Sequence, residues 1–288
     1  NYNGLGVVEE CLEAFRRACR LLTWELYVVD NASTDGSREI VARRYPWVHL
    51  IASPTNRGYA GGASLGLSAC SGRRLVVSNH DVRVAEDALL VLLDAMEENP
   101  RVGLVGPAIL DPTGRRLDPD VGSFPTLPSV LARRILENSG VERLCRRSRR
   151  YRGWFGEGRD PDRAGPVDQI SGAFLCVRRE ALLEVGPMDE RYFLFLEETD
   201  WCRRMWKAGW QVAVEPRASV RHLGSVSTGR LPDRDRIHDR SMARYLEKHR
   251  GLAEAVLFRI ATAALVRPLS LPRRLYLAAK ARWQATTN

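Results

Sequence analysis

Hydrophobic and polar positions change their spacing in a regular way along the first 110 residues. Short apolar runs typical of buried strands alternate with segments whose apolar side chains recur at helical spacing. The apolar runs lie at 26–29, 48–51, 74–78 and 102–106, and the helical segments at 7–22, 37–44, 60–70 and 86–98. This alternation predicts an α/β fold with a mostly parallel sheet flanked by helices. Ligands bind beyond the carboxyl ends of such strands, where Asp30 and Asp81 fall.

The pattern breaks between about 111 and 165, where proline, glycine and arginine are frequent and one helix is predicted near 128–144. We interpret this segment as a mobile insertion over the active site. Regular spacing of apolar positions resumes after this segment. It predicts a strand at 167–177, helices at 179–185 and 197–208, and a strand at 211–214. Gly209 is expected to end the second of these helices. The segment 238–288 is predicted to be a helical tail, apolar at 253–266 and basic at 267–282.

The net charge of +9 suggests an anionic partner. The densest basic run, Arg143 to Arg152, has no interleaved aromatic ladder and no DNA-reading pattern, so we expect no nucleic acid. A membrane surface or a phosphorylated substrate explains the charge at least as well, and a solvated basic face without a partner is the alternative. The six cysteines form no C-x-x-C pair, which favours reduced thiols in a cytoplasmic protein. The first residues, Asn1 to Gly4, look like the end of a strand.

Asn79, Asp81 and His222 are candidate ligands of a hard divalent cation. Carboxylates at strand ends, with a histidine and without cysteine, are typical of Mg²⁺ or Mn²⁺ sites that bridge phosphate oxygens. Each residue alone has an ordinary structural alternative, because an aspartate after a strand can cap a helix or a turn and a lone histidine can be structural.

The acidic run Glu197-Glu198-Thr199-Asp200 follows a strongly apolar segment, 193–196. Mutual repulsion and partial desolvation raise the pKa of such carboxylates toward the range of a general base. The alternative is that the acids only decorate a helix N-terminus, where the helix dipole favours them. The glycines in 58–62 match neither a dinucleotide-binding pattern nor a phosphate-binding P-loop.

Several segments in order resemble the family 2 glycosyltransferases, which are inverting enzymes with the nucleotide-sugar-binding GT-A fold. The matching segments are Tyr2-Asn3-Gly4, 28–37 (VVDNASTDGS), 56–62 (NRGYAGG), Asn79-His80-Asp81, Ser171-Gly172-Ala173, 195–202 (FLEETDWC) and 221–225 (RHLGS). Within the family, the Val-Asp-Asn-Ala-Ser-Thr-Asp-Gly-Ser and Glu-Glu-Thr-Asp-Trp-Cys segments are closest to the bacterial rhamnosyltransferase-like group. The resemblance covers residues 1 to about 250.

The resemblance implies a role for each matching residue. Asp81 and His222 would bind the metal, with Asn79 in the first position of the family's D-x-D. Glu198 would be the general base, with Asp200 in reserve because Glu198 stands where the family usually has aspartate. Glu197 would be a structural acid. The implied donor-binding residues are Tyr2, Asn3, Asp30, Asn31, Asn56, Gly58, Asn79, Ser171, Gly172 and Ala173.

The expected organisation is a GT-A catalytic domain at 1–237 and a helical C-terminal extension at 238–288. The domain would contain a nucleotide-binding half at 1–110, the insertion at 111–165 and an acceptor and catalytic half at 166–237. Expected partners are a nucleotide-sugar donor, with dTDP-rhamnose the leading candidate, and a glycan or polyprenyl-diphosphate-linked acceptor in cell-envelope polysaccharide synthesis. The basic, apolar tail predicts peripheral attachment at the inner face of the membrane; the alternative is a helix packed on the catalytic domain.

Three rival functions stay open at this point. The first is a non-catalytic nucleotide-sugar or glycan-binding module of the same fold, against which the retained acids argue. The second is a nucleic-acid-binding protein, which only the charge suggests. The third is a nucleotidyltransferase, which would carry a glycine- and arginine-containing loop near the N-terminus that this sequence lacks.

Overall fold

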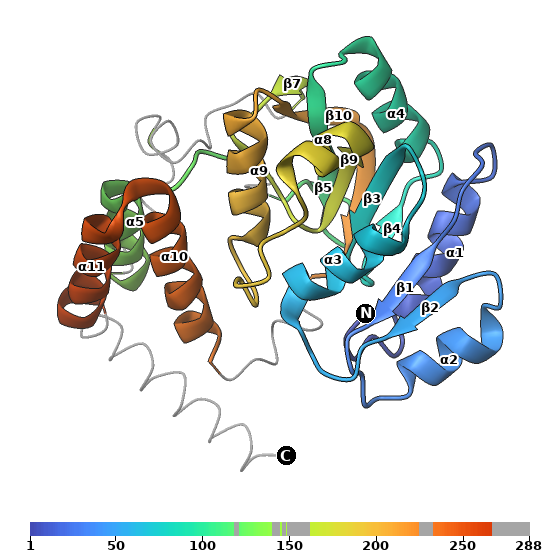
Figure 1. Cartoon of the computed structure of the whole chain (residues 1–288), viewed down its shortest axis with the longest axis horizontal. Helices are drawn as coiled ribbons and strands as arrows, with labels where there is room; N and C mark the ends of the chain where they lie inside the picture. Colours follow the sequence, from blue (N-terminus) through green and yellow to red (C-terminus); the bar gives the residue numbers. More distant parts are fainter. Residues whose placement is uncertain (118–120, 140–144, 146–147, 149–161, 225–232, 267–288) are drawn as a thin grey trace. The chain divides into compact units, whose positions relative to one another are not determined.

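The computed structural model describes residues 1–288 apart from 118–120, 140–144, 146–147, 149–161, 225–232 and 267–288. Contacts divide the chain into two units (Figure 1). The first is made of 1–124 and 159–241, and the second of 125–158 and 242–288. Part of the predicted insertion therefore groups with the C-terminal residues. The predicted domain limits themselves stay a prediction.

The first unit is built on a central sheet. Its strands follow the order β3 (Arg74–Ser78), β9 (Phe174–Arg178), β5 (Val102–Leu110), β10 (Gln211–His222) and β4 (Val82–Val84), and β7 (Gly165–Pro166) also pairs with β10. β5 and β10 are parallel, β9 is antiparallel to β3 and β5, and β4 is antiparallel to β10. β3, β5 and β10 thus run in one direction. Two further pairs are β1 (Tyr27–Asp30) with β2 (His49–Ala52), parallel, and β6 (Val121–Gly122) with β8 (Gln169–Ile170).

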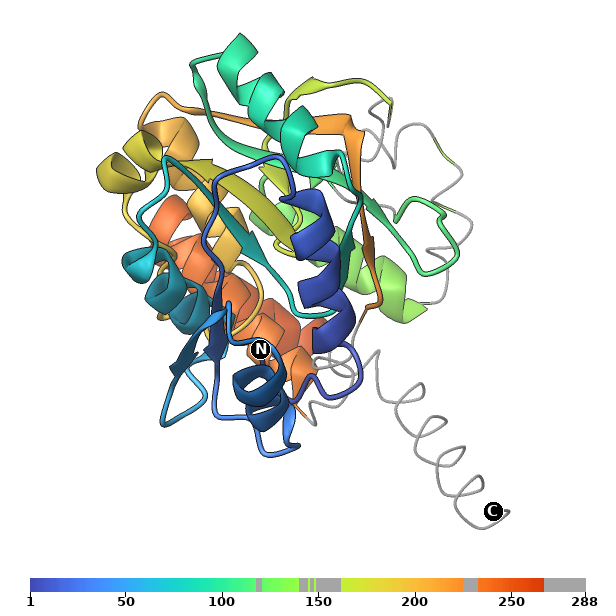
Figure 2. The same cartoon turned by 90° about the vertical axis from the view of Figure 1, so that its right-hand side faces the viewer.

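Helices cover both faces of this sheet, as the alternating pattern predicts (Figures 1 and 2). On one face lie α1 (Val8–Ala18) and α4 (Ala88–Glu98). On the other lie α3 (Gly58–Ala69), α8 (Arg179–Val185) and α9 (Glu197–Lys207). A smaller apolar cluster joins α1 and α2 (Ser37–Arg44) to β1. The predicted α/β class is confirmed.

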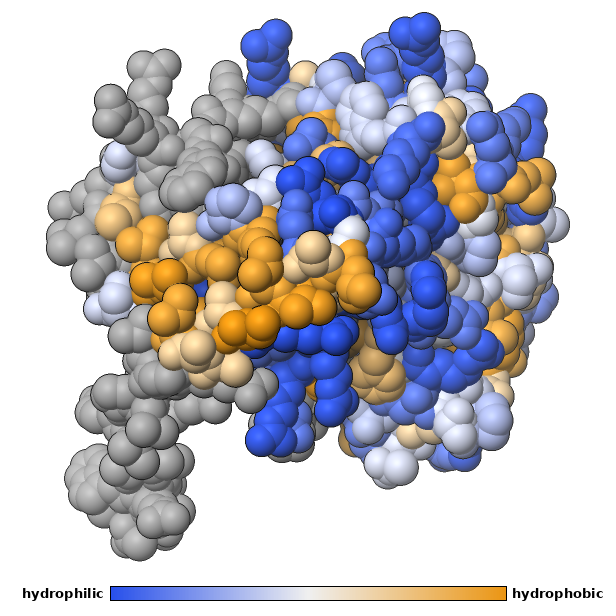
Figure 3. Space-filling view, turned by 60° about the vertical axis from the view of Figure 1, so that its left-hand side comes forward, coloured by the Kyte–Doolittle hydropathy of each residue, from blue (hydrophilic) through white to orange (hydrophobic). Residues whose placement is uncertain are grey.

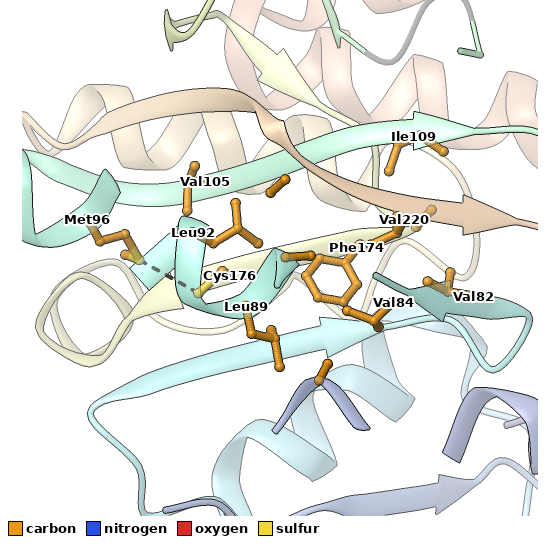
Figure 4. Packing of buried hydrophobic residues seen from close by; sticks show 14 of the residues in the cluster. Val82, Val84, Leu89, Leu92, Met96, Val105, Ile109, Phe174, Cys176 and Val220 are labelled. Atoms are coloured by element: carbon orange, nitrogen blue, oxygen red, sulfur yellow. Dashed lines mark hydrogen bonds between the residues drawn. The ribbon is translucent and has the colours of Figure 1, made fainter. Parts of the chain in front are cut away.

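Alternation along the strands explains why two apolar cores form. Successive side chains of a strand point to opposite faces, so Phe174 and Cys176 of β9 join one core and Leu175 and Val177 join the other. Figure 4 shows Phe174 and Cys176 facing α4, whose Leu89, Leu92 and Met96 recur at helical spacing. The nearly continuous apolar sequence of β5 fits a strand that is buried on both faces.

Several strands differ from the prediction, and three of them bear on the site. The strand expected at 167–177 is divided into β8 and β9, because the small residues 171–173 turn the chain between them. The strand expected at 211–214 continues to His222, with a register shift against β5 around Pro216. β4 was not expected, since three residues give too short a pattern; its pairing with β10 supplies the missing stabilisation.

The second unit contains α5 (Leu127–Ser139), α11 (Leu252–Ala261) and the π-helical segment η2 (Thr262–Val266). α10 (Arg234–Arg250) continues into this unit from the first. The helices expected near 128–144 and in the tail are thus present where the structure describes them, and 267–288 lies outside the described residues. No helix among the described residues is long and apolar enough to cross a membrane.

Candidate active site

A cavity of about 1060 Å³ lies in the first unit and reaches the carboxyl ends of β1 and β3. One part is apolar, with walls that include Phe15, Leu26 and Leu75. Residues that follow the strand ends form its polar part. The predicted site residues that line the cavity are Tyr2, Asn31, Asn56, Gly58, Asn79, Asp81, Ser171, Gly172, Ala173, Glu198 and His222. Asn3, Asp30 and Asp200 are not among its described lining residues.

The backbone brings Asp81 and His222 together. β4 begins directly after Asp81, and its first residue Val82 pairs with His222 at the end of β10. The Leu223 N–H donates to the Asp81 carbonyl at 2.9 Å, which extends this pairing by one step. His222 Nε2 consequently lies 3.2 Å from Asp81 Oδ1 and 3.4 Å from Asn79 Nδ2.

These three side chains fit a hard divalent cation. Asp81 Oδ1 is buried and, apart from its contact with His222, has no hydrogen-bond partner in the described part of the chain. Burial opposes ionisation of Asp81, but His222 and His80 more than offset it and lower the pKa of this carboxyl. Turning the Asn79 amide would point its oxygen at the same spot. The described residues contain no cluster of three acidic, histidine or cysteine ligands, so phosphate oxygens and water would complete the shell, as Mg²⁺ usually requires.

The side chain of Asn31 builds the loop that leads into α3. Its amide nitrogen donates to Asn56 Oδ1 at 3.1 Å and to the Gly58 carbonyl at 2.8 Å, while its oxygen accepts the Arg57 N–H at 2.9 Å. Asn56 Oδ1 also accepts the Gly58 N–H at 2.9 Å. The Asn31 amide is thus engaged by the chain itself, and a donor contact made by either asparagine stays a prediction.

Asp30 and Asn3 hold the backbone next to the cavity through hydrogen bonds. The fully buried Asp30 accepts hydrogen bonds from Asn1 Nδ2 at 2.9 Å and from the Ser33 N–H at 3.0 Å. Asn3 adopts a left-handed conformation (φ 51°), and its Oδ1 accepts the Thr34 N–H at 2.8 Å. Backbone hydrogen bonds of Asn1 with Val29 and Asn31 resemble those of a strand end.

The acidic run at the start of α9 directly follows a turn with a strained backbone. Phe195 and Leu196 have φ angles of 70° and 68°, a conformation that bulky residues rarely adopt. Next to them, the Phe193 carbonyl accepts the Tyr59 N–H at 2.8 Å. A side chain at Gly58 (φ 73°) would place its Cβ 2.0 Å from the Phe193 oxygen. Only glycine therefore lets the two loops meet.

Glu197 and Glu198 both line the cavity at the first turn of α9. Burial raises the pKa of Glu198 above its usual value, partly offset by backbone hydrogen bonds at Glu198 and Thr199. Burial and the charge of Glu198 raise the pKa of Glu197 further, and Glu197 Oε2 has no hydrogen-bond partner among the described residues. Gly172 packs on Glu198, because a Cβ there would lie 3.4 Å from its Cβ and Cγ.

Asp200 has a different environment from the two glutamates. It is completely buried, and its Oδ2 accepts a hydrogen bond from Arg204 Nε at 2.8 Å. Arg204 also donates to the carbonyls of Val185 and Pro187, at 2.7 and 2.6 Å. Asp200 thus binds Arg204, and Arg204 links α9 to the end of α8 and the residues that follow it.

The folded domain and its site define a GT-A glycosyltransferase. The chain belongs to glycosyltransferase family 2: the sequence model described as Glycosyl transferase family 2 matches residues 1–181. It is 33% identical over 238 residues to the N-acetylglucosaminyl-diphospho-decaprenol L-rhamnosyltransferase of Mycobacterium tuberculosis, which covers 77% of this chain and 74% of that protein.

Solved structures agree on the fold. The mannosyltransferase PcManGT from Pyrobaculum calidifontis, in complex with GDP-Man and Mn²⁺, is 17% identical and superimposes with a TM-score of 0.56 over 98% of this chain and 78% of that one. GalNAc-T7 with UDP, GalNAc and Mn²⁺ is 14% identical, with a TM-score of 0.58 over 85% of this chain and 45% of that one. At these identities the likeness supports the fold alone.

Two residues of the site were not singled out from the sequence. The Tyr59 hydroxyl donates to the Gly172 carbonyl, and burial together with Glu197 and Glu198 raises its pKa well above the usual value. His80 lines the cavity, and burial lowers its pKa to about 4. A Cβ at Gly4 would lie 2.5 Å from the His80 ring. Both residues lie inside segments that carry the family resemblance, which was the available signal.

Proposed function

We propose that the protein is a metal-dependent, inverting glycosyltransferase in which Glu198 is the general base. The observation that supports this best is that one cavity is lined by Glu198 at the start of α9 and by the Asp81–His222 pair, which the pairing of β4 with β10 brings together. A displacement needs a general base on one side of the anomeric carbon and a group that stabilises the leaving diphosphate on the other. One group removes the proton of the attacking hydroxyl, and the other end of the site holds the departing diphosphate.

The proposed reaction is a direct displacement. The acceptor hydroxyl oxygen attacks the anomeric carbon, its proton passes to a carboxylate oxygen of Glu198, and the bond from that carbon to the nucleoside diphosphate breaks with inversion. The raised pKa of Glu198 suits this step, because a more basic carboxylate accepts a proton more readily. Asp81, His222 and Asn79 would hold Mg²⁺ or Mn²⁺, which when bound neutralises negative charge on the leaving group.

Tyr59 and Gly172 would position the base. The hydrogen bond from Tyr59 fixes the Gly172 carbonyl, and Gly172 in turn packs on the Glu198 side chain. A Cβ at Gly172 would lie in van der Waals contact with the Glu198 stem, at 3.4 Å. Asp200 would act only through Arg204, so we assign the proton transfer to Glu198 and not to the reserve candidate.

For the donor and the acceptor we propose dTDP-rhamnose and a polyprenyl-diphosphate-linked sugar in cell-envelope polysaccharide synthesis. The support is the 33% identity with an enzyme whose name specifies rhamnosyl transfer to N-acetylglucosaminyl-diphospho-decaprenol. A lipid-linked acceptor would place the reaction at the inner face of the cell membrane.

The decisive experiment is a thermal-shift screen of nucleotide sugars with and without Mn²⁺, followed by a transfer assay with the stabilising donor. We expect stabilisation by a deoxythymidine-diphosphate sugar that requires the cation, and a product of inverted anomeric configuration by NMR. A matched control is Asp81→Asn, which should abolish the cation-dependent stabilisation. Tight donor binding without hydrolysis or transfer to any acceptor would instead favour the alternative, a non-catalytic nucleotide-sugar-binding module.

A further inference from the structure

Glu197 is buried beside the proposed base, and one of its carboxyl oxygens is unpaired. Charged and polar side chains cover much of the surface seen in Figure 3, whereas Glu197 is only 4% exposed. Its Oε2 atom has no hydrogen-bond partner among the described residues. A buried polar atom without a partner lowers stability. Because Glu197 lines the cavity, this unpaired oxygen points to a ligand that binds there.

Asp200 shows the environment of a structural acid in the same helix. It is completely buried, as Glu197 nearly is, but its Oδ2 accepts a hydrogen bond from Arg204 Nε at 2.8 Å. Asp200 is also not among the described residues that line the cavity. A purely structural role therefore does not explain the unpaired oxygen of Glu197, although the family resemblance implies such a role.

The Tyr59 hydroxyl locates Glu197 within the site. This hydroxyl donates a hydrogen bond to the Gly172 carbonyl. Burial raises the pKa of Tyr59, and the charges that add to this effect are, strongest first, those of Glu197, Glu198 and Asp81. The hydroxyl is thus within range of the proposed base and of the proposed cation site, and Glu197 acts on it more strongly than either. In the proposed displacement the donor sugar lies between the base and the diphosphate, so Glu197 is placed to reach a hydroxyl of that sugar.

The carboxyl group of Glu197 suits a sugar hydroxyl. Burial and the charge of Glu198 raise the pKa of Glu197 well above its usual value, so the group keeps a proton. A protonated carboxyl offers one O–H donor together with acceptor lone pairs, and a hydroxyl offers the same combination. The two groups can therefore form a hydrogen bond in either direction without placing a second negative charge beside the diphosphate.

We propose that Glu197 binds a hydroxyl of the donor sugar through a hydrogen bond and so holds the sugar ring for attack at its anomeric carbon. This inference rests on the proposed function, because it needs a nucleotide sugar in the cavity. It makes Glu197 a residue that selects donors, since a site built to hydrogen-bond a hydroxyl discriminates against analogues that lack it. Glu198 stays free to accept the proton of the acceptor.

Calorimetry with a matched pair of ligands, in the presence of Mn²⁺, tests the proposal. The first ligand, dTDP, carries the nucleoside diphosphate alone, and the second, dTDP-rhamnose, adds the sugar. Glu197→Met removes the hydrogen-bonding atoms and keeps a side chain of similar length. We expect this variant to bind dTDP as the wild type does and to bind dTDP-rhamnose about tenfold more weakly. Glu197→Gln, whose amide also donates and accepts, should bind both ligands nearly as the wild type does.

Analogues of dTDP-rhamnose that each lack one ring hydroxyl identify the contact. One of them should bind the wild type about tenfold more weakly than dTDP-rhamnose does. The same analogue should cost Glu197→Met no further affinity, because the contact is already absent. Circular dichroism melting of each variant controls for folding.

Three results would overturn the proposal: equal weakening of dTDP and dTDP-rhamnose in Glu197→Met, no weakening of either ligand, or a further loss in this variant with every deoxygenated analogue. The proposed function fails in a different way. A wild type that transfers no sugar, while its variants show the selective loss of dTDP-rhamnose binding, would refute the proposed reaction and support this contact.

Discussion

Replacing Glu198 with glutamine is the sharpest perturbation of the proposed chemistry. Glutamine keeps the volume of the side chain beside Gly172 but cannot accept the proton of the acceptor hydroxyl. General-base catalysis contributes about 10² to 10⁴ in rate, which corresponds to about 2.7 to 5.5 kcal/mol of activation free energy. We therefore expect kcat to fall by about 10² to 10⁴, while donor affinity in calorimetry stays close to that of the wild type because Glu198 is not among the residues that would hold the cation.

The pH profile gives a second readout of the same residue. Glu198 must be ionised to act as a base, so the rate should fall as the pH drops through its pKa. Burial raises that pKa above the usual value. The apparent pKa of the acid limb of the kcat/KM profile should therefore be higher than the pKa of an ordinary glutamate, which is about 4.3. This limb should disappear in the Glu198→Gln variant. In Glu198→Asp, the carboxylate is retained on a shorter arm, and part of the activity and the limb should return.

Asp200→Asn is the matched control for these variants. It removes a carboxylate two residues away that does not line the cavity and is paired with Arg204. Breaking this buried pair should lower the free energy of unfolding by about 3 kcal/mol, with kcat per folded molecule largely retained. Near-normal turnover of Glu198→Gln, or an equal loss of turnover in folded Asp200→Asn, would refute the assignment of the base.

Further predictions concern stability, loop packing and the cation. Glu197→Gln should stabilise the protein at neutral pH in chemical denaturation. The folded state keeps a proton on Glu197 that the unfolded chain loses above about pH 4.3, so the stability of the wild type falls as the pH rises. Equal slopes of stability against pH for the two proteins would contradict this. Gly58→Ala should destabilise far more than Gly209→Ala and weaken donor binding, since both have positive φ but only the first meets the Phe193 carbonyl; similar melting temperatures would disprove the close contact. Asp81→Asn, or chelation of the wild type, should abolish nucleoside-diphosphate binding in calorimetry, and binding that survives both would exclude the proposed cation site.

The sequence could predict the residues at strand ends, because strand period and turn composition are local properties. Asp81 and Asn79 were found in this way. His222 was also a candidate ligand, but its contact with Asp81 could not be predicted, since a short β4 and the continuation of β10 past Pro216 bring the two side chains together. Neither feature has a local pattern long enough to read.

The roles within the acidic run show the same limit. Three carboxylates in four residues look alike until the helix direction and the neighbouring loops are known. The one available signal was the i,i+4 spacing of Asp200 and Arg204, which predicts an ion pair on a helix. The orphan oxygen of Glu197 and the packing of Gly172 on Glu198 depend on loops distant in sequence, so no local pattern contains them.

The pairing of β4 with β10 has a consequence for how the cation is captured. Asp81 and His222 are set by the register of two hydrogen-bonded strands and by the Leu223 N–H, not by a loop that must first become ordered. Little conformational entropy would then be lost when the ion arrives. The proposed cation pocket would thus be preorganised, so the calorimetric signature of donor binding should be dominated by the sugar nucleotide and its diphosphate.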